Sequence, residues 1–180
     1  MDRQVIYVVL FVALSLPFII PGMGFKMPEP SPEVRQAYEY VENLPNNCRE
    51  EGVKAMHDAT ECGVLGGVYE MAEASGVGVI LYKDKIPVQE GVLEICKLFG
   101  MEPYSSISEG TLVIAAVPDK ADEIVRRLKN KGIDAEIVGE FIPRERGMWV
   151  VESGEQKPLE HPRVDPFWSA IDEALKRGLS

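Results

Sequence analysis

Helical and strand-like segments alternate along this chain from residue 63 onwards, and the alternation is what most limits its fold. Val64, Val68 and Met71 recur at the spacing of one helix face, whereas 77–82 and 111–117 are short apolar runs of the kind that forms buried strands. The other expected elements are helices at 92–99, 118–128 and 166–176, and strands at 135–141 and 147–152. The pattern predicts an α/β (α+β) layered domain, a mixed sheet with helices packed on one side.

The first 25 residues have a different character. Between residues 5 and 20 only Ala13, Ser15 and Pro17 are not strongly apolar. A helix of roughly 16 to 21 such residues is just long enough to cross a hydrocarbon core of about 30 Å. The run therefore predicts an uncleaved transmembrane helix, that is, a single-pass membrane anchor whose orientation the flanking basic residues leave open. A secretory signal peptide is the alternative, although no A-x-A-like cleavage site follows.

Changes in composition divide the chain into four parts. Residues 1–25 form the anchor or signal-like segment, 26–47 a proline-rich linker with a short helix, 48–152 the main domain, and 153–180 a tail with a helix. The main domain begins without an obvious preceding strand. Either two unrelated pieces have been joined, or an anchor has been added to a domain, and the sequence does not separate these alternatives.

Composition and charge exclude several classes of protein. Hydrophobic residues make up 46% and charged residues 27%, as in a globular domain. The net charge of -10 argues against a nucleic-acid partner, because phosphate binding needs clustered Lys and Arg. The three cysteines have no C-x-x-C spacing, so neither a disulfide framework nor a zinc knuckle is expected.

The stretch 57–67 concentrates chemically active groups. It reads H-D-A-T-E-C-G-V-L-G-G and opens an amphipathic helix, where free amides and the helix dipole favour anions. His57, Asp58 and Thr60 are therefore candidates for the edge of a phosphate or metal-nucleotide site. The plain alternative is that Asp58 only caps the helix.

Five ordered motifs carry a family resemblance. They are H-D-A-T-E-x-G at residue 57, Y-E-M-A-E-A-S-G-V-G at 69, K-I-P-V at 85, E-I-C-K-L-F-G at 94 and I-S-E-G-T-L-V-I-A-A-V at 107. Over residues 52–141 the chain resembles the C-terminal domain of the AIR synthase-related superfamily. Within that group it is most similar to hydrogenase maturation factors of the carbamoyl dehydratase type and to their archaeal relatives.

The resemblance implies roles for individual residues. The D-x-T-x-G loop of the family faces a cleft shared with an ATP-binding domain. Asp58 would then lie near a magnesium-nucleotide as a metal ligand, His57 would be its catalytic neighbour, and Thr60 and Gly63 would form a phosphate edge. Glu109, in the S-E-G turn, matches a glutamate of the catalytic cleft.

The chain also departs from the family pattern. Cys62 replaces the first glycine of a Gly-Gly pair, either as a reactive thiolate or as a tolerated small residue. The family's ATP-binding domain and its Pro-Arg-x-Cys tail are not found in the sequence, although 161–168 resembles the tail of archaeal relatives.

Two functional hypotheses follow from the sequence. The first is that the chain supplies half of an ATP- and Mg²⁺-dependent cleft, with the chemistry of a synthase or dehydratase. It would be inactive alone and completed by an ATP-binding domain from a partner chain or homodimer. The alternative is a non-catalytic interaction domain tethered at a membrane, or a truncated or fused remnant, although the family itself is cytoplasmic.

Overall fold

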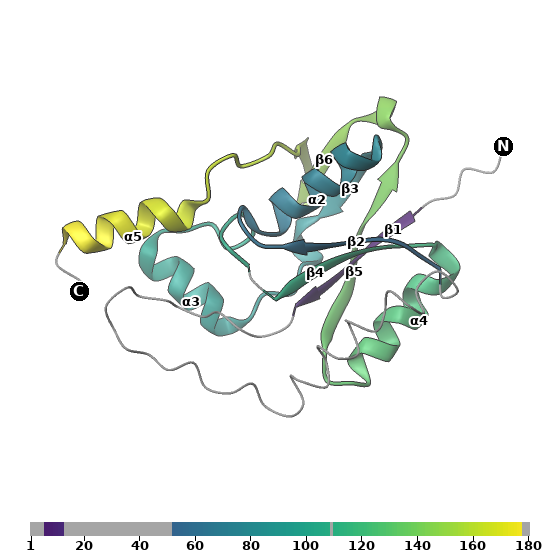
Figure 1. Ribbon diagram of the computed structural model, residues 1–180, viewed down its shortest axis with the longest axis horizontal. Coiled ribbons are helices and arrows are strands. Elements are labelled where there is room, and N and C mark those ends of the chain that lie inside the picture. Colours follow the sequence, from purple (N-terminus) through teal and green to yellow (C-terminus); the bar gives the residue numbers. More distant parts are fainter. Residues whose placement is uncertain (1–5, 13–51, 109, 178–180) are drawn as a thin grey trace.

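The computed structural model describes residues 6–12, 52–108 and 110–177 (Figure 1). Its strands are β1 (Ile6–Val12), β2 (Val53–Ala59), β3 (Gly78–Tyr82), β4 (Thr111–Ala116), β5 (Asp134–Ile142), β6 (Met148–Glu152) and β7 (Glu155–Pro158). Its helices are α2 (Gly63–Ser75), α3 (Glu90–Phe99), α4 (Pro118–Lys129) and α5 (Pro166–Lys176), with short 3₁₀ turns η1 (Lys83–Lys85) and η2 (Arg144–Arg146). The helices expected from periodicity are confirmed. The linker and helix expected at 26–47 lie outside the described residues.

The described strands form one mixed sheet, as the sequence predicts. Their order is β2-β4-β1-β5-β3-β6-β7, and β3 with β6 is the parallel pair among otherwise antiparallel neighbours. β2 and β7 are the two outer strands. The polar motif at 57–67 therefore begins on an edge strand.

Helices cover both faces of the sheet, so the expectation of helices on one side is wrong. Strand β4 shows this by alternation, because successive side chains point to opposite faces. Val113 and Ala115 belong to the apolar cluster that includes α2, whereas Ile114 and Ala116 belong to the cluster that includes α4. The sequence marks which residues of β4 are apolar, but not which helix each one meets.

The chain direction explains why α2 and α4 lie on opposite faces. Helix α2 connects β2 to β3, and α4 connects β4 to β5; each links two parallel strands and moves across the sheet in the same direction. The first pair of strands runs antiparallel to the second. Such crossovers are right-handed, so reversing the strand direction moves the helix to the other face.

Strand β1 overturns part of the N-terminal prediction. Residues Ile6–Val12 lie between β4 and β5 in the sheet, so a transmembrane helix extending over residues 5–20 is wrong at these positions. Apolar runs fit a strand buried on both faces as well as a helix, and periodicity alone does not distinguish them. In the part of the chain that the structure describes, no helix combines the length and apolarity needed to cross a membrane.

Candidate functional site at the start of α2

The site predicted at 57–67 is a strand–turn–helix corner rather than a loop that opens a helix. His57 and Asp58 lie in β2, the turn occupies 60–62, and α2 begins at Gly63. The strand and helix approach closely where Gly67 faces Ala59: a Cβ added at Gly67 would stand 2.9 Å from that of Ala59. A larger side chain at Gly67 would force the corner open.

The strand separates two of the predicted site residues. His57 extends toward α2, where its imidazole reaches Glu70, and Ala59 belongs to the cluster on the same face. Asp58 lies between His57 and Ala59 in the strand, and successive side chains of a strand point to opposite faces, so the exposed side chain of Asp58 is directed to the other face of the sheet. His57 and Asp58 are therefore not brought together on one side of the sheet.

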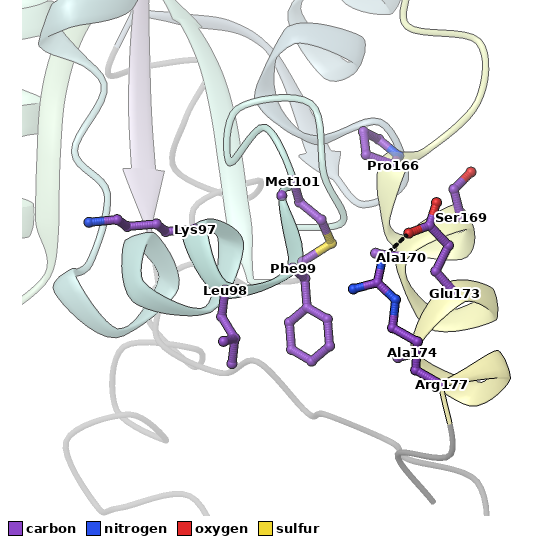
Figure 2. Close-up of a pocket in the computed structure, with 11 residues that line it drawn as sticks. Lys97, Leu98, Phe99, Met101, Pro166, Ser169, Ala170, Glu173, Ala174 and Arg177 are labelled. Carbon is purple, nitrogen blue, oxygen red and sulfur yellow. Dashed lines mark hydrogen bonds and ion pairs between the residues drawn. The ribbon is translucent and has the colours of Figure 1, made fainter.

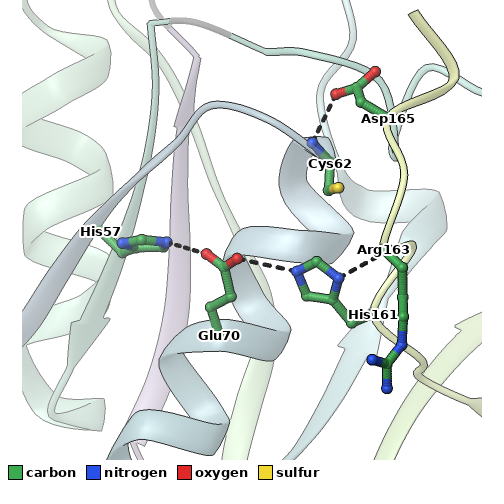
Figure 3. A network of polar contacts seen from close by, with 6 residues as sticks. All are labelled: His57, Cys62, Glu70, His161, Arg163 and Asp165. Carbon is green, nitrogen blue, oxygen red and sulfur yellow. Dashed lines mark hydrogen bonds and ion pairs between the residues drawn. The ribbon is translucent and has the colours of Figure 1, made fainter. Parts of the chain in front are cut away.

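His57 instead belongs to a cluster that sequence analysis missed, drawn in Figure 3. Its Nε2 lies 2.9 Å from one carboxylate oxygen of Glu70, and Nε2 of His161 lies 3.0 Å from the other. The backbone N–H of Arg163 donates to Nδ1 of His161 at 2.9 Å, which leaves Nε2–H of that ring as the donor to Glu70. We call His57, Glu70 and His161 the imidazole–carboxylate bridge.

The bridge alters the acidity of Glu70. Hydrogen bonding from His161 holds the pKa of the Glu70 carboxyl below its usual value, and the contact with His57 acts in the same direction, against a smaller opposing effect of burial. About half of the Glu70 side chain is exposed, so water screens these contacts. The bridge ties β2, α2 and the tail after β7 together.

A second tail residue, Asp165, reaches the start of α2. One oxygen of its carboxylate accepts a hydrogen bond from the backbone N–H of Cys62 at 2.7 Å (Figure 3). The other oxygen accepts one from the backbone N–H of Phe167 at 2.9 Å, where Asp165 caps α5. Asp165 is only 3% exposed. A carboxylate thus occupies the place where the sequence predicts an anion, and it comes from 103 residues away in the chain.

Other groups of the chain bond the neighbouring amides. The N–H of Leu65 donates to the carbonyl of Tyr104 at 3.0 Å, and that of Gly63 to the carbonyl of Thr60 at 3.4 Å. Gly63 is buried, and a Cβ there would stand 2.6 Å from the carbonyl oxygens of Tyr104 and Ser106. Packing thus requires glycine at position 63. Thr60, the other predicted residue of the phosphate edge, is exposed.

The S-E-G turn contacts the corner between β2 and α2. The Ser108 N–H donates to the Thr60 carbonyl at 3.0 Å, and the Ser108 hydroxyl donates to the Ala59 carbonyl at 2.8 Å. Two motifs about fifty residues apart in the sequence therefore lie side by side. Glu109 itself, the predicted cleft glutamate, lies outside the described residues.

Cys62 has a backbone conformation that is common for glycine and rare for other residues. Its φ is 60°, in the left-handed region that glycine adopts without strain. The side chain is buried, and burial, followed by the negative charges of Asp165, Glu61 and Glu70, raises the pKa of its thiol. Of the two alternatives, the structure favours a tolerated small residue over a reactive thiolate.

The described residues do not assemble a metal site by themselves. Among them, no group of three or more His, Cys, Asp or Glu side chains is arranged to hold a metal ion. Asp58, the predicted metal ligand, is an exposed carboxylate on an edge strand. Any Mg²⁺ bound here would need most of its ligands from a nucleotide or another domain.

Sequence signals for the missed residues were weak. Glu70 has the position of a solvent-facing residue of α2, and nothing in its spacing identifies its two imidazole partners. His161 and Asp165 lie in the segment 161–168, which stands out only as similar to the tails of archaeal relatives. Their contacts depend on the tail returning to α2 after β7.

Comparisons with known proteins agree with this geometry. The family model described as AIR synthase related protein, C-terminal domain, matches residues 22–152. A protein described as a hydrogenase expression/formation protein in Methanocaldococcus jannaschii is 30% identical over 131 residues, 71% of this chain and 39% of its own length. The carbamoyl dehydratase HypE of Escherichia coli is 34% identical over 118 residues, 64% of this chain and 35% of its own.

Solved structures share the fold. A crystal structure of E. coli HypE superposes with a TM-score of 0.66 at 23% identity, covering 92% of this chain and 52% of that one. PurL of Thermotoga maritima, described as complexed with ATP, gives 0.63 at 19% identity, covering 92% and 27%. The chain spans well under two thirds of the length of these relatives.

Proposed function

Because the chain belongs to the AIR synthase-related proteins through their C-terminal domain, we propose that it supplies one wall of an ATP- and Mg²⁺-dependent cleft. The other wall is an ATP-binding domain outside these 180 residues, and in this proposal a partner chain provides it. The corner between β2 and α2, together with the S-E-G turn, is the part of this chain that faces the nucleotide.

The observation that carries the proposal is the meeting of these two motifs. Ser108 bonds both Thr60 and Ala59, so the residues flanking Glu109 lie against the turn that follows Asp58. The exposed Asp58 and Thr60 and the partly buried Ser108 thus lie at one end of the edge strand. A site that needs a phosphate-facing hydroxyl and a carboxylate at close range is supported by this arrangement.

The lengths of the relatives support the need for a second domain. The matched region makes up 39% and 35% of the two curated relatives, so most of each lies outside it. PurL is described as complexed with ATP, with ADP and with AMPPCP, and one further relative, of Methanococcus maripaludis, is a selenide, water dikinase. We extend to this chain only the expectation that ATP enters the completed cleft.

One observation favours the alternative, a non-catalytic interaction domain. The amides that would hold a phosphate at the start of α2 are bonded within the chain, Cys62 to Asp165 and Leu65 to Tyr104. For that reason we assign the phosphates mainly to the missing domain. Thr60 and Asp58 remain the exposed groups on this wall.

Isothermal titration of the full chain with Mg-ATP tests the proposal. The chain is titrated alone and then mixed with a separately expressed ATP-binding domain of the M. jannaschii relative. We expect binding to the mixture that exceeds the sum of the two separate titrations. Titrations that merely add up would refute the shared cleft and leave the interaction domain as the function.

Single substitutions then test which residues of this chain contribute to Mg-ATP binding by the mixture. Asp58→Ala and Glu109→Ala should each weaken binding to the mixture at least tenfold, or about 1.4 kcal/mol, with thermal stability unchanged. Asp134→Ala, an exposed carboxylate at the start of β5, is the matched control and should bind as the wild type does. Loss of stability without loss of binding would return Asp58 and Glu109 to structural roles.

A further inference from the structure

A groove between α3 and α5 leaves large apolar side chains uncovered (Figure 2). It has a volume of about 850 Å³, and its two sides carry Leu98, Phe99 and Met101 from α3 and the residues after it, and Ala170 and Ala174 from α5. Leu98 is 78% exposed. Beside the groove, α5 also exposes Trp168 and Leu175, which are 54% and 53% accessible. Apolar surface of this kind marks a place where something binds.

Strand β1 ends near the loop that connects α3 to β4. Val12 pairs with Thr111, the first residue of β4, and the loop leading to Thr111 comes directly from the end of α3. In Figures 1 and 2 the arrowhead of β1 points toward the side of the molecule where α3 lies. Strand β1 therefore ends on the side of the sheet where α3, one wall of the groove, lies.

The residues that follow Val12 are apolar enough to fill it. Residues 13–25 read A-L-S-L-P-F-I-I-P-G-M-G-F and contain seven large apolar side chains: Leu14, Leu16, Phe18, Ile19, Ile20, Met23 and Phe25. An extended chain of thirteen residues reaches up to about 40 Å, ample for the groove. The same thirteen residues as a helix would measure only about 20 Å, too short for a hydrocarbon core of about 30 Å.

The rest of the connection can still return to the sheet. Residues 26–52 lead to Val53, at the opposite end of the edge strand from Ala59. The distance to be recovered is the length of β2, whose seven residues span roughly 23 Å. Seating 13–25 at the α3–α5 end thus places no strain on the connection between β1 and β2.

We propose that residues 13–25 bind in the α3–α5 groove of the same chain and cover its apolar surface. The apolar run at the N-terminus is then divided between two intramolecular roles: Ile6–Val12 form a strand of the sheet, and 13–25 cover α3 and α5. In this arrangement neither 6–12 nor 13–25 spans a bilayer. This inference does not depend on the nucleotide cleft proposed above.

Cross-linking in the full chain tests this placement. In a Cys48→Ser background, Phe18→Cys is combined with Ala170→Cys in the groove, or with Lys157→Cys on the outer strand β7 as the matched control. A short bismaleimide should join the groove pair within one chain at least ten times more efficiently than the control pair. Equal efficiencies would overturn the proposal, and so would cross-links found only between chains, which would make a second copy the occupant.

Hydroxyl-radical labelling of the unmodified chain needs no substitution. Leu98 is 78% exposed and Val164, which does not line the groove, is 67% exposed, so the two aliphatic side chains should be labelled at similar rates if nothing covers the groove. We expect Leu98 to be labelled at least five times more slowly than Val164. Similar rates, or protection of Leu98 only after addition of phosphatidylglycerol vesicles, would overturn the proposal, the latter in favour of a membrane surface.

Discussion

Helices α2 and α4 have the same role in the sheet, yet their first turns are held in different ways. Each is a crossover between parallel strands, one on each face. Helix α4 begins with Pro118 at its first position, and its first amides donate to Val117 immediately before it. Helix α2 begins at a left-handed Cys62 whose amide is bonded to Asp165 in the tail.

The difference lies in where the contacts of each helix start come from in the sequence. The first turn of α4 is complete within its own sequence and faces a purely apolar cluster. The first turn of α2 collects groups from the loop before β4 and from the tail, and polar side chains surround it. Such a corner can change when the tail or another domain moves, whereas the start of α4 is bonded to the residue just before β2, through the Val117 N–H and the Gly52 carbonyl.

The largest expected effect lies on the α4 face. Leu128 is 1% exposed in the apolar cluster there, so Leu128→Ala should lower the free energy of unfolding by about 2 to 5 kcal/mol through lost burial and a cavity. Denaturant unfolding measures it. Because Cys62 lies at the start of α2 on the other face, its rate of reaction with a maleimide under native conditions should be the same in Leu128→Ala as in the wild type. A loss below about 1 kcal/mol would mean that α4 is not part of the main core.

Replacing Asp165 should lower stability less than Leu128→Ala does, but it should make Cys62 react faster. Asp165→Ala removes the acceptor for the Cys62 amide and the cap of α5, and should lower stability by about 1 to 3 kcal/mol. Maleimide labelling of Cys62 should become faster. Each decrease of about 1.4 kcal/mol in the free energy of opening the tail should raise the labelling rate tenfold. Asp172→Ala, which breaks an exposed ion pair with Lys176 on α5, is the control. Unchanged labelling in Asp165→Ala would show that the tail does not guard the corner.

Cys62 tests the backbone strain at the corner. Its φ of 60° suits glycine, so Cys62→Gly should be more stable than Cys62→Ala by about 1 kcal/mol. The two variants lose the same thiol, and thermal unfolding compares them directly. If alanine proved as stable as glycine, the left-handed conformation at Cys62 would be wrong.

The smallest effect concerns the imidazole–carboxylate bridge. The pKa of Glu70 is lowered by its imidazole partners, so its contribution to stability is present above the unfolded value near about 4.3 and is lost as the pH falls through the lower folded value. Glu70→Gln should therefore reduce the melting temperature slightly at about pH 6. The difference from wild type should shrink as the pH falls below the unfolded pKa and disappear below the folded one. We expect less than about 1 kcal/mol, because the pair is half exposed.

The control for the bridge is Glu155→Gln, an exposed carboxylate on β7 that pairs with Lys157 rather than with an imidazole. Thermal melts of the wild type and both variants at several pH values give the comparison. A difference for Glu70→Gln that stayed constant down to pH 3 would contradict the linkage.

The same contrast explains what the sequence could predict. Helix α4 was predictable because its start signal, Pro118, and the spacing of Ala121, Ile124 and Leu128 are local. The family resemblance assigned both the D-x-T-x-G loop and the S-E-G turn to a catalytic cleft, but it did not predict their contact through Ser108. Contacts of α2 with His161 and Asp165 span 91 and 103 residues, and no local pattern encodes them.

Strands were harder to predict than helices for two physical reasons. β2 carries His57 and Asp58 within seven residues on the edge of the sheet, so it lacks a continuous apolar run. β1 has the opposite problem, because a strand in the middle of a sheet covered on both faces is apolar throughout and resembles a membrane segment. The missing information in both cases is which strands become neighbours.

Amide hydrogen exchange tests the central claim most directly. The full chain is followed with and without the separately expressed ATP-binding domain and Mg-ATP. We predict slower exchange at 60–65 and 107–111, where the corner and the S-E-G turn meet, and no change across 118–129 in α4. No change at the corner, or an equal change in α4, would contradict the account that α2 begins at a functional site.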